Sequence, residues 1–453
     1  MNRQHSTSES RLARRQFIQG SSAVLAGAAA LSRLPMVHAA SPSELSQVKI
    51  GLIGCGGRGT GAVLDALGAA TKVIYPRAGY HTEDVAEGAS ISRSDVQIVA
   101  LADLFPERLE QCKRQLDKLG ISIPAENSFT GIDAYQKLLD IAEVNYVVLA
   151  TPPHFRPAHL KAAIEAGKHV FMEKPVAVDV PGVRSIIESG ELAKQKGLGI
   201  GAGTQRRHLK SYQETIKRLQ DGAVGDIVAA RCYWNGNQIW VIERQEGWSD
   251  LEWQLRNWNY FTWLAGDHIV EQHVHNLDIM NWVLGAHPIR VVAAVGGRQV
   301  RTEPKYGHIF DHFAVEFEYP GGVRMTSQSR QMNGCDNLVG EAVVGTKGTS
   351  DCQKLIETFD GQRWRFREKD PNAYKQEHED LIASIRAGSP LNEAQAIAES
   401  TLTGILGREA AYSGKSIDWD AAWKSETRLG PESYEFGPYH TPEVAMPGRY
   451  VFK

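Results

Sequence analysis

The segment from Gly266 to Gly285 carries side chains that can move a proton. Glu271 and His275 stand four residues apart, which places them on one face of a helix. Asp278 and Trp282 continue that strip. An almost wholly apolar stripe runs beside it and predicts a buried face; its residues are Val270, Val274, Leu277, Asn281 and Leu284. We therefore expect the carboxylate and the imidazole to face a cleft rather than open water.

Two other interpretations of these histidines stay open. His268, Glu271 and His275 have the spacing i, i+3, i+7, so they can share a helix face and bind zinc. No HExxH motif or carboxylate-rich partner segment accompanies them, and the sequence therefore predicts no metal. Structural histidines that only form hydrogen bonds are the second alternative.

A glycine-rich turn follows the first apolar run of the chain. Residues 48–53 are predicted as a buried strand, and Gly54, Gly56 and Gly59 then form a G-x-G-x-x-G motif with Gly57 inside it. In that motif the first glycine makes the turn, the second admits a pyrophosphate, and the third lets the next helix pack closely. The helix N-terminus attracts phosphate, and Arg58 is expected to add a contact.

The second predicted strand, residues 96–103, ends at Asp103. An acidic side chain there accepts the ribose hydroxyls and repels a 2′-phosphate, so it favours NAD over NADP. Asp103 lies further from Gly59 than the roughly 20 residues that are usual. Residues 68–95 therefore read as an insertion, and a helix N-cap remains the alternative role for Asp103.

Two further strands end in polar residues. Residues 146–150 lead into Thr151 and two prolines before His154, and residues 169–172 lead into Glu173 and Lys174. Ligands bind at the carboxyl ends of the strands in open α/β sheets. These residues are therefore candidates for a cofactor crevice.

With these motifs the chain resembles the Gfo/Idh/MocA oxidoreductases, the family of glucose-fructose oxidoreductase and inositol dehydrogenase. The matching residues are Gly54 to Gly59, Ala102-Asp103, Thr151-Pro152 and the run AGKHVFMEKP from Ala166 to Pro175. The resemblance extends over nearly all of the chain after the first forty residues. It implies an α/β fold: an N-terminal Rossmann dinucleotide-binding domain plus a C-terminal α+β domain with a large open, mainly antiparallel sheet.

The resemblance also implies roles for particular residues. It places Lys174 near the substrate, with a cis peptide before Pro175, and it makes Thr151, His154, Glu173 and Lys174 cofactor-binding residues. Relatives usually carry an aspartate four residues before the helix histidine, where this chain has Glu271. We therefore predict Lys174 and His275 as proton-transfer groups, with Glu271 orienting the substrate or the imidazole. Many relatives have a second histidine where this chain has Arg156.

The predicted second domain supplies candidate substrate contacts. Six of the ten tryptophans lie within one short segment, at positions 234, 240, 248, 253, 258 and 263. Sugar rings pack an apolar face on aromatic planes, while Arg, Gln and His bind their hydroxyls. The candidates are Gln205, Arg206, His208, Trp263 and His273. The alternative for most of the tryptophans is that they anchor a long loop or a subunit interface.

Composition excludes several classes of protein. The chain has 453 residues, is 42% hydrophobic and 23% charged, and carries a net charge of −3. It has no long basic run for nucleic acid and no apolar stretch long enough to span a membrane. The five cysteines lack CxxC spacing and are expected to be free or buried thiols.

The sequence divides into four predicted parts. Residues 1–39 resemble a twin-arginine export signal, with Arg14-Arg15, an alanine-rich run and a small-residue cleavage site at Ala39. Residues 47–175 are the predicted Rossmann domain, residues 176–370 the substrate and oligomerisation domain, and residues 371–453 helices and a tail that return to the first domain.

These predictions combine into one hypothesis. We expect an exported, periplasmic oxidoreductase that uses tightly bound NAD on a ring hydroxyl of a sugar or glycoside, and that assembles as a homodimer or homotetramer by the family resemblance. Free NAD is not expected in the periplasm, so we expect the cofactor to be bound in the cytoplasm, before export, and not released. The alternatives are a redox-neutral NAD-dependent glycosidase, which oxidises, eliminates and re-reduces, and a noncatalytic sugar-binding protein on the same fold.

Overall fold

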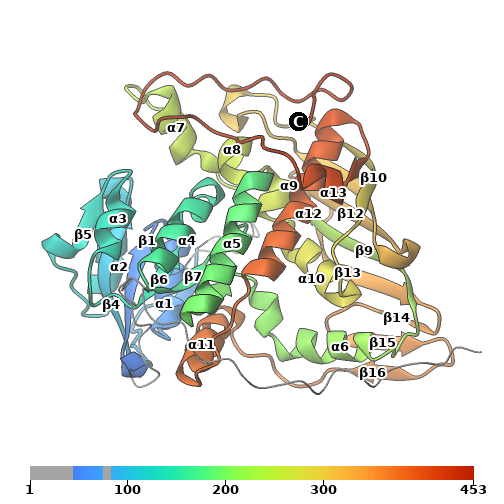
Figure 1. Ribbon diagram of the computed structural model, residues 1–453, viewed down its shortest axis with the longest axis horizontal. Helices are drawn as coiled ribbons and strands as arrows, with labels where there is room; N and C mark the ends of the chain where they lie inside the picture. Colours follow the sequence, from blue (N-terminus) through green and yellow to red (C-terminus); the bar gives the residue numbers. More distant parts are fainter. Residues whose placement is uncertain (1–43, 75–82) are drawn as a thin grey trace, which may run out of the picture. The chain divides into compact units, whose positions relative to one another are not determined.

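The computed structural model describes residues 44–74 and 83–453. The predicted export signal lies outside these residues. The first domain is built on a six-stranded parallel sheet in the order β5-β4-β1-β6-β7-β8 (Figure 1). Its strands are β1 Val48–Ile53, β4 Val96–Asp103, β5 Ser128–Thr130, β6 Tyr146–Leu149, β7 His169–Met172 and β8 Ile200–Ala202.

Helices cover both faces of this sheet, because alternate residues of each strand point to opposite sides. One face packs its Val, Ile and Leu side chains on α1 Gly57–Ala66, α2 Pro106–Asp117 and α11 Ala373–Arg386. The other face packs on α3 Ala134–Leu139, α4 Arg156–Glu165 and α5 Val180–Lys196. The predicted Rossmann arrangement is confirmed.

The predicted insertion between the first helix and the second parallel strand is confirmed. It contains a separate two-stranded antiparallel sheet, β2 Thr71–Val73 and β3 Glu83–Val85. The strand that ends at Asp103 is therefore β4, the neighbour of β1 in the parallel sheet.

The second domain is built on a nine-stranded sheet in the order β16-β15-β14-β13-β9-β12-β11-β10-β17. All neighbouring strands in it are antiparallel except β9 and β12, which confirms the expected mainly antiparallel sheet. The strands are β9 Ile227–Gly236, β10 Arg290–Gly297, β11 His312–Glu318, β12 Arg324–Gln331, β13 Leu338–Gly345, β14 Gly348–Ser350, β15 Leu355–Thr358, β16 Arg363–Arg365 and β17 Ile417–Asp418.

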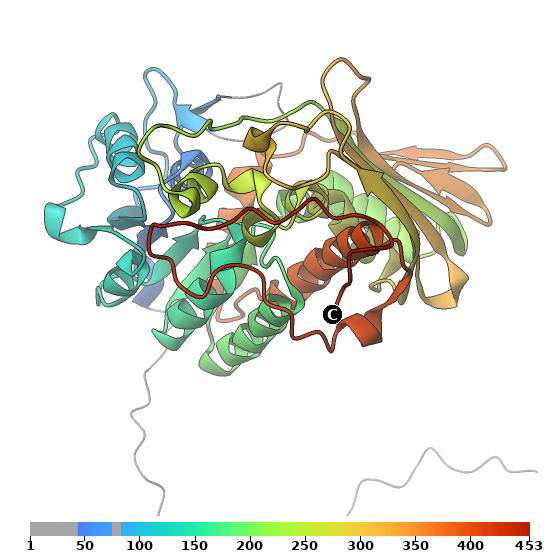
Figure 2. The ribbon, with the colours of Figure 1, turned by 90° about the horizontal axis from the view of Figure 1, so that it is seen from above.

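Helices α10 Val274–Leu284 and α12 Ala394–Ser413 pack on this sheet through one continuous apolar core (Figure 2). The remaining helices of this half are α6 Lys210–Gln220, α7 Asp250–Arg256, α8 Thr262–Ala265, α9 His268–Glu271 and α13 Trp419–Ala422. Short 3-10 helices are η1 Glu44–Ser46, η2 Ala125–Asn127, η3 Pro153–Phe155, η4 Gln205–His208, η5 Trp258–Tyr260, η6 Pro304–Tyr306 and η7 Pro320–Gly322.

The prediction of one continuous helix over residues 266–285 is wrong. The chain forms α9 and α10 with a break at Gln272 and His273. At the break the His273 N–H donates to the carbonyl of His268, one residue further back than in a regular α-helix. The predicted buried stripe is nevertheless correct, because Val270, Val274 and Leu277 are fully buried.

The C-terminal segment returns across the chain. Helix α11 packs against α1 and β8, and the tail after α13 runs back over the second domain and α5. In that tail the Gly437 carbonyl accepts the Leu251 N–H at 3.2 Å, and the Leu429 N–H donates to Asp179 Oδ2 at 2.9 Å. The five cysteines are free thiols, and only Cys335 is exposed. No helix in residues 44–74 and 83–453 is long and apolar enough to cross a membrane.

Candidate active site

The turn between β1 and α1 has the space and the donors that a diphosphate requires. Gly54 has a φ of +100°, and a side chain there would lie 2.7 Å from the backbone of Ala150. A Cβ on Gly59 would come within 1.9 Å of the Gly54 carbonyl oxygen, whereas a Cβ on Gly56 would meet no atom within 4 Å. Helix α1 starts at Gly57 with no side-chain cap, so its first N–H groups remain available to an anion.

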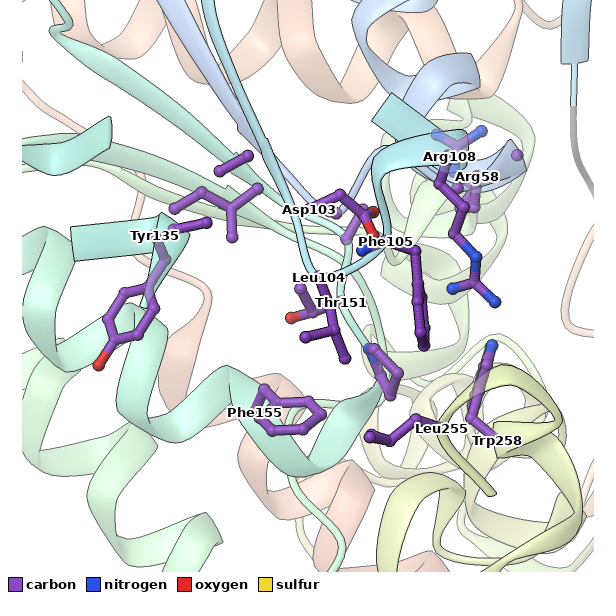
Figure 3. A pocket seen from close by; sticks show the side chains of 18 of the residues that line it. Arg58, Asp103, Leu104, Phe105, Arg108, Tyr135, Thr151, Phe155, Leu255 and Trp258 are labelled. Atoms are coloured by element: carbon purple, nitrogen blue, oxygen red, sulfur yellow. Dashed lines mark hydrogen bonds between the residues drawn. The ribbon is translucent and has the colours of Figure 1, made fainter. Parts of the chain in front are cut away.

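A cavity of about 450 Å³ extends from this turn, a size typical of ligand sites (Figure 3). We name it the cofactor crevice. From the first domain it is lined by Gly54, Gly56, Gly57, Arg58, Asp103, Leu104, Phe105, Arg108, Tyr135, Thr151 and Phe155. The second domain adds Trp240, Val241, Ile242, Leu255 and Trp258.

Asp103 lies at the rim of the cofactor crevice and braces the glycine turn. Its Oδ2 accepts the Cys55 N–H at 2.6 Å and its Oδ1 accepts the Phe105 N–H at 2.8 Å. Burial raises the pKa of this carboxyl, while the charge of Arg108 and the two amides oppose the rise. The N-cap of α2 is Phe105, so Asp103 is not the helix cap that the alternative interpretation required. Arg108, five residues after Asp103, also lines the crevice and brings a positive charge close to this carboxyl.

Contacts between the two domains close one side of the cofactor crevice. Arg256 of α7 forms an ion pair with Glu107 of α2, and its guanidinium lies 3.9 Å from the centre of the Phe105 ring. Phe436 of the C-terminal tail stacks on the same ring with centroids 6.1 Å apart. Segments that are remote in sequence therefore meet at Phe105.

A second, more polar cavity lies beside Lys174, and we name it the reaction pocket. The peptide bond between Lys174 and Pro175 is cis, as predicted. Lys174 Nζ donates to Glu271 Oε1 at 2.9 Å and to the Glu271 carbonyl at 2.5 Å. His275 lines the same pocket, so the structure brings Lys174, Glu271 and His275 together. The other lining residues include Arg58, Thr151, Arg156, Glu173, Gln205, Trp234, Trp258, Gln272, Tyr374 and Glu377.

His275 presents a neutral imidazole to the reaction pocket. Its ring stacks on Trp234 with centroids 5.8 Å apart and an interplanar angle of 23°. Burial lowers the pKa of His275 well below its usual value, and the positive charges of Lys174 and Arg206 lower it further. At neutral pH the ring is therefore a proton acceptor.

Arg58 lies between the two cavities and is held by carboxylates. Its Nε donates to Glu173 Oε1 at 2.6 Å, and its Nη atoms lie 3.4 Å from Asp65 and 3.9 Å from Glu377. Burial alone would lower the pKa of Arg58, but these three carboxyls raise it above its usual value. The guanidinium also packs over the Tyr374 ring. Arg58 thus lines the cofactor crevice, and two of the carboxylates that hold it, Glu173 and Glu377, line the reaction pocket.

Three of the predicted histidines line neither cavity. His154 pairs with Tyr434 of the tail at 2.6 Å, and burial lowers its pKa to about 4. His273 pairs with Ser327 at 2.7 Å inside the core, where burial lowers its pKa to about 3. Burial would lower the pKa of His208, but a hydrogen bond to Asp380 at 2.7 Å and the carboxylate of Glu393, 3.5 Å away, raise it to about 9.

Two further predicted substrate residues also lie outside the cavities. Trp263 is 3% exposed and donates to Gln254 Oε1 at 2.8 Å within an aromatic cluster. Arg206 forms a buried ion pair with Glu341. Of the predicted substrate residues, only Gln205 lines the reaction pocket.

The structure adds pocket residues that the sequence did not indicate. Tyr374 and Glu377 come from α11, about 200 residues after Lys174 along the chain, in a helix whose pattern showed no chemical motif. Trp240 and Trp258 belong to the predicted tryptophan cluster, yet they line the cofactor crevice. In the described parts of the chain no group of three or more His, Cys, Asp or Glu is arranged to hold a metal ion. His268 bonds to Asp267 and Ser329 and does not line the reaction pocket.

Comparisons with known proteins agree with this architecture. The model for the oxidoreductase family with an NAD-binding Rossmann fold matches residues 48–204, and the Gfo/Idh/MocA C-terminal domain model matches residues 212–351. The chain shares the fold of an aldose-aldose oxidoreductase from Caulobacter crescentus, with a TM-score of 0.60 and 19% identity. That match covers 82% of this chain and 99% of the other.

The curated relatives match this chain over only part of their own length. A 2,7-anhydro-N-acetylneuraminate hydratase from Escherichia coli is 26% identical over 54% of this chain and 58% of its own. An inositol 2-dehydrogenase/D-chiro-inositol 3-dehydrogenase from Halalkalibacterium halodurans is also 26% identical, over 51% of this chain and 57% of its own. The chain thus spans little more than half the length of these relatives. The two domain matches, which follow one another along the chain, show that it belongs to the Gfo/Idh/MocA oxidoreductase family.

Proposed function

We propose that this protein is a nicotinamide-dependent oxidoreductase that acts on a ring hydroxyl of a sugar, cyclitol or glycoside. One observation carries the proposal: Lys174, Glu271 and His275 line a polar pocket that adjoins the glycine turn. The named activities of the inositol and aldose relatives support this substrate class.

The residues of the cofactor crevice fit a dinucleotide. Gly56 leaves open space beside the free N–H groups of α1, and Asp103 lies at the carboxyl end of β4. A nicotinamide held there would supply hydride transfer to or from the substrate carbon. Asp103 favours NAD, whereas Arg108 would tolerate the additional phosphate of NADP.

The geometry of the reaction pocket suggests how the proton is handled. The amine of Lys174 is held by two oxygens of Glu271, so a further N–H remains to bind the substrate oxygen. The neutral imidazole of His275 accepts the hydroxyl proton. Glu271 thereby fixes the position of the Lys174 amine, and Lys174 steadies the oxygen as it loses its proton.

We propose further that the cofactor stays bound through turnover and that the protein is exported by the twin-arginine route. The domain contacts at Phe105 support retention, because dissociation of the nucleotide would require opening them. Arg14 and Arg15 support export, and fractionation of cells that carry the R14K/R15K change tests it. A homodimer or homotetramer is the proposed assembly.

The deciding experiment identifies the nucleotide that is released on denaturation by mass spectrometry. A panel of polyols and glycosides is then monitored at the nicotinamide absorbance. We expect NAD in the released fraction, and we expect a neutral sugar or cyclitol to reduce the bound nucleotide. K174A should keep the nucleotide but lose turnover. Purified protein without nucleotide would instead favour a noncatalytic sugar-binding role.

A redox-neutral cycle is the second candidate. The relative from Escherichia coli supports this candidate, because its name, a hydratase, denotes a reaction without net oxidation. In this cycle a transient ketone acidifies the neighbouring C–H, and loss of that proton expels the glycosidic group and leaves a double bond. Water then adds to the double bond, and the ketone is reduced again. Release of aglycone without accumulation of reduced nucleotide would distinguish it from simple dehydrogenation.

A further inference from the structure

Strand β12 places polar side chains on the face of the sheet that packs against the helices. Its buried residues alternate with more exposed ones; they are Met325, Ser327, Ser329 and Gln331, each at most 1% exposed. The core-facing side of such a strand is ordinarily apolar. Three successive polar positions there need hydrogen-bond partners, because an unpaired buried polar group is costly.

The two serines meet histidines of the helical segment that faces them. Ser329 Oγ lies 3.2 Å from His268 Nε2 in α9, and Ser327 Oγ lies 2.7 Å from His273 Nε2 at the break between α9 and α10. All four side chains are at most 3% exposed. Hydrogen bonds in such a dry environment are strong and favour a single arrangement of the groups that they join.

A third contact completes the set. Gln331 donates from its Nε2 to Gln272 Oε1 at the same break. We name Ser327, Ser329 and Gln331 the β12 polar row. The residues that it holds lie on both sides of Glu271: one is three positions before it, and the other two follow it directly.

The break that the β12 polar row holds frees the carbonyl of Glu271. In a regular α-helix this oxygen would accept the N–H of His275, four residues later. Here the His275 N–H donates to the Gln272 carbonyl at 3.4 Å, and the Glu271 carbonyl accepts from Lys174 Nζ at 2.5 Å. The position of the amine therefore depends on a backbone oxygen whose neighbours along the chain are fixed by β12.

One part of this network has the order of groups found in a Ser-His-Asp triad. His268 Nδ1 lies 3.1 Å from Asp267 Oδ1, while its Nε2 faces Ser329. Neither Ser329 nor His268 lines the cofactor crevice or the reaction pocket, and Asp267 is fully buried. Asp267 also accepts from the Phe310 N–H and the Tyr412 hydroxyl. A nucleophile must reach its substrate, so these residues fix the start of α9 instead.

We propose that the β12 polar row positions the proton-transfer site, with Ser327 acting through His273 to hold the amine of Lys174. The inference rests on the proposed function, in which that amine binds the substrate oxygen. Glu271 transmits the effect, because its carbonyl lies between the held residues and the amine. Ser327 lines neither cavity, so it is a positioning residue and not a catalytic one.

The test follows the amine itself and does not require turnover. The purified protein, with its bound nucleotide, is treated with formaldehyde and a borane reductant, and peptide mass spectrometry gives the rate at which each lysine is methylated. S327A should speed methylation of Lys174 by about 10-fold or more, as the loss of one hydrogen bond to a charged group predicts. Lys168 is the internal control, because two backbone carbonyls also hold its amine; its rate should not change.

Thermal unfolding separates positioning from a structural role. S327A leaves the buried His273 ring without its hydroxyl partner, so its unfolding temperature should fall. S327A/H273L removes both polar partners and should regain most of that loss, yet Lys174 should still be methylated rapidly. S350A is the matched control: it removes a buried hydroxyl with two hydrogen bonds from β14, three strands from β12. It should be destabilised like S327A, with Lys174 methylated at the parent rate.

Turnover gives the second measurement. With a substrate from the panel, S327A and S327A/H273L should each lower kcat by about 10-fold or more, because a displaced amine meets the reacting oxygen poorly. KM should change by less than about 3-fold, so the loss appears in kcat. S350A should change neither constant.

The outcomes separate this proposal from the proposed function. The β12 polar row has no positioning role if Lys174 is methylated equally in the parent and S327A, including no methylation in either. The same holds if S327A/H273L returns to the parent rate, or if Lys168 is accelerated as much as Lys174. A change confined to Lys174 in a protein that converts no substrate of the panel supports the positioning and rejects the oxidoreductase activity. Turnover with the same kcat in the parent and S327A retains that activity and rejects the positioning.

Discussion

The buried ion pair between Lys174 and Glu271 allows chemistry to be separated from folding. Lys174 is 13% exposed and Glu271 6% exposed at the side chain, so little solvent reaches either charge. In K174M the Glu271 carboxylate loses its cationic partner. Removing one member of a buried pair costs about 3–5 kcal/mol, and we expect that loss in the free energy of unfolding.

The double variant K174M/E271M removes the charge that K174M leaves behind. Replacing both members of a buried pair by apolar side chains of similar volume is often nearly neutral. Methionine fits this purpose because it adapts to irregular space. We therefore expect the double variant to unfold within about 2 kcal/mol of the parent.

Turnover should not follow stability in this pair of variants. Loss of a group that takes part in acid–base catalysis costs about 100- to 10,000-fold in rate, and both variants lack it. The assay combines urea unfolding with reduction of the bound nucleotide by the best substrate of the panel. Recovery of turnover in K174M/E271M, or a K174M protein as stable as the parent, would refute the reasoning.

Three further predictions follow from the same geometry. Burial lowers the pKa values of three histidines to about 4, so the unfolded chain takes up their protons first as the pH falls below about 6.5. These histidines are His154, His169 and His308, and each should lower the free energy of unfolding by about 1.4 kcal/mol per pH unit between pH 6.5 and 4. Asp65, whose pKa is raised to about 8, partly offsets this decline because the folded state holds its proton. Unfolding curves at pH 7 and pH 5 measure the difference. R256A, which removes the ion pair with Glu107, should speed nucleotide loss on gel filtration, while R244A, which removes the ion pair with Asp250 at the start of α7, should not. R108A should weaken NADP more than NAD, as measured by titration of nucleotide-free protein.

Local patterns predicted the elements that local forces determine. The strand before Gly54 and the helix after it formed as expected, because the turn needs a positive φ and a close backbone approach that glycine permits. Residues 313–319 alternate between apolar and polar side chains and precede Pro320-Gly321-Gly322, a pattern that predicts a half-buried strand and a hairpin turn. The structure has β11 and a turn at these positions. Neither prediction depended on distant parts of the chain.

The site was less accessible to sequence reasoning because distant partners decide where its side chains point. His208 lies beside Gln205 in η4, yet it turns to Asp380 and Glu393 of the C-terminal segment. Trp263 is one of the six clustered tryptophans, and the structure buries it in an apolar core instead of exposing it to a cavity. Glu377 lacked any motif, since its place in the pocket results from the packing of α11 on the first domain.

The break between α9 and α10 combines a local pattern with a contact from a distant part of the chain. A regular helix would engage the Glu271 carbonyl in its own hydrogen-bond ladder, whereas the break leaves that oxygen to the amine of Lys174. The same break brings Gln272 into the pocket wall while His275 keeps its place on the first turn of α10. Periodicity alone predicted a continuous helix, and it failed at the point where a residue from the other domain binds. The irregular backbone is therefore what lets one short segment supply both the anchor for the amine and the proton acceptor.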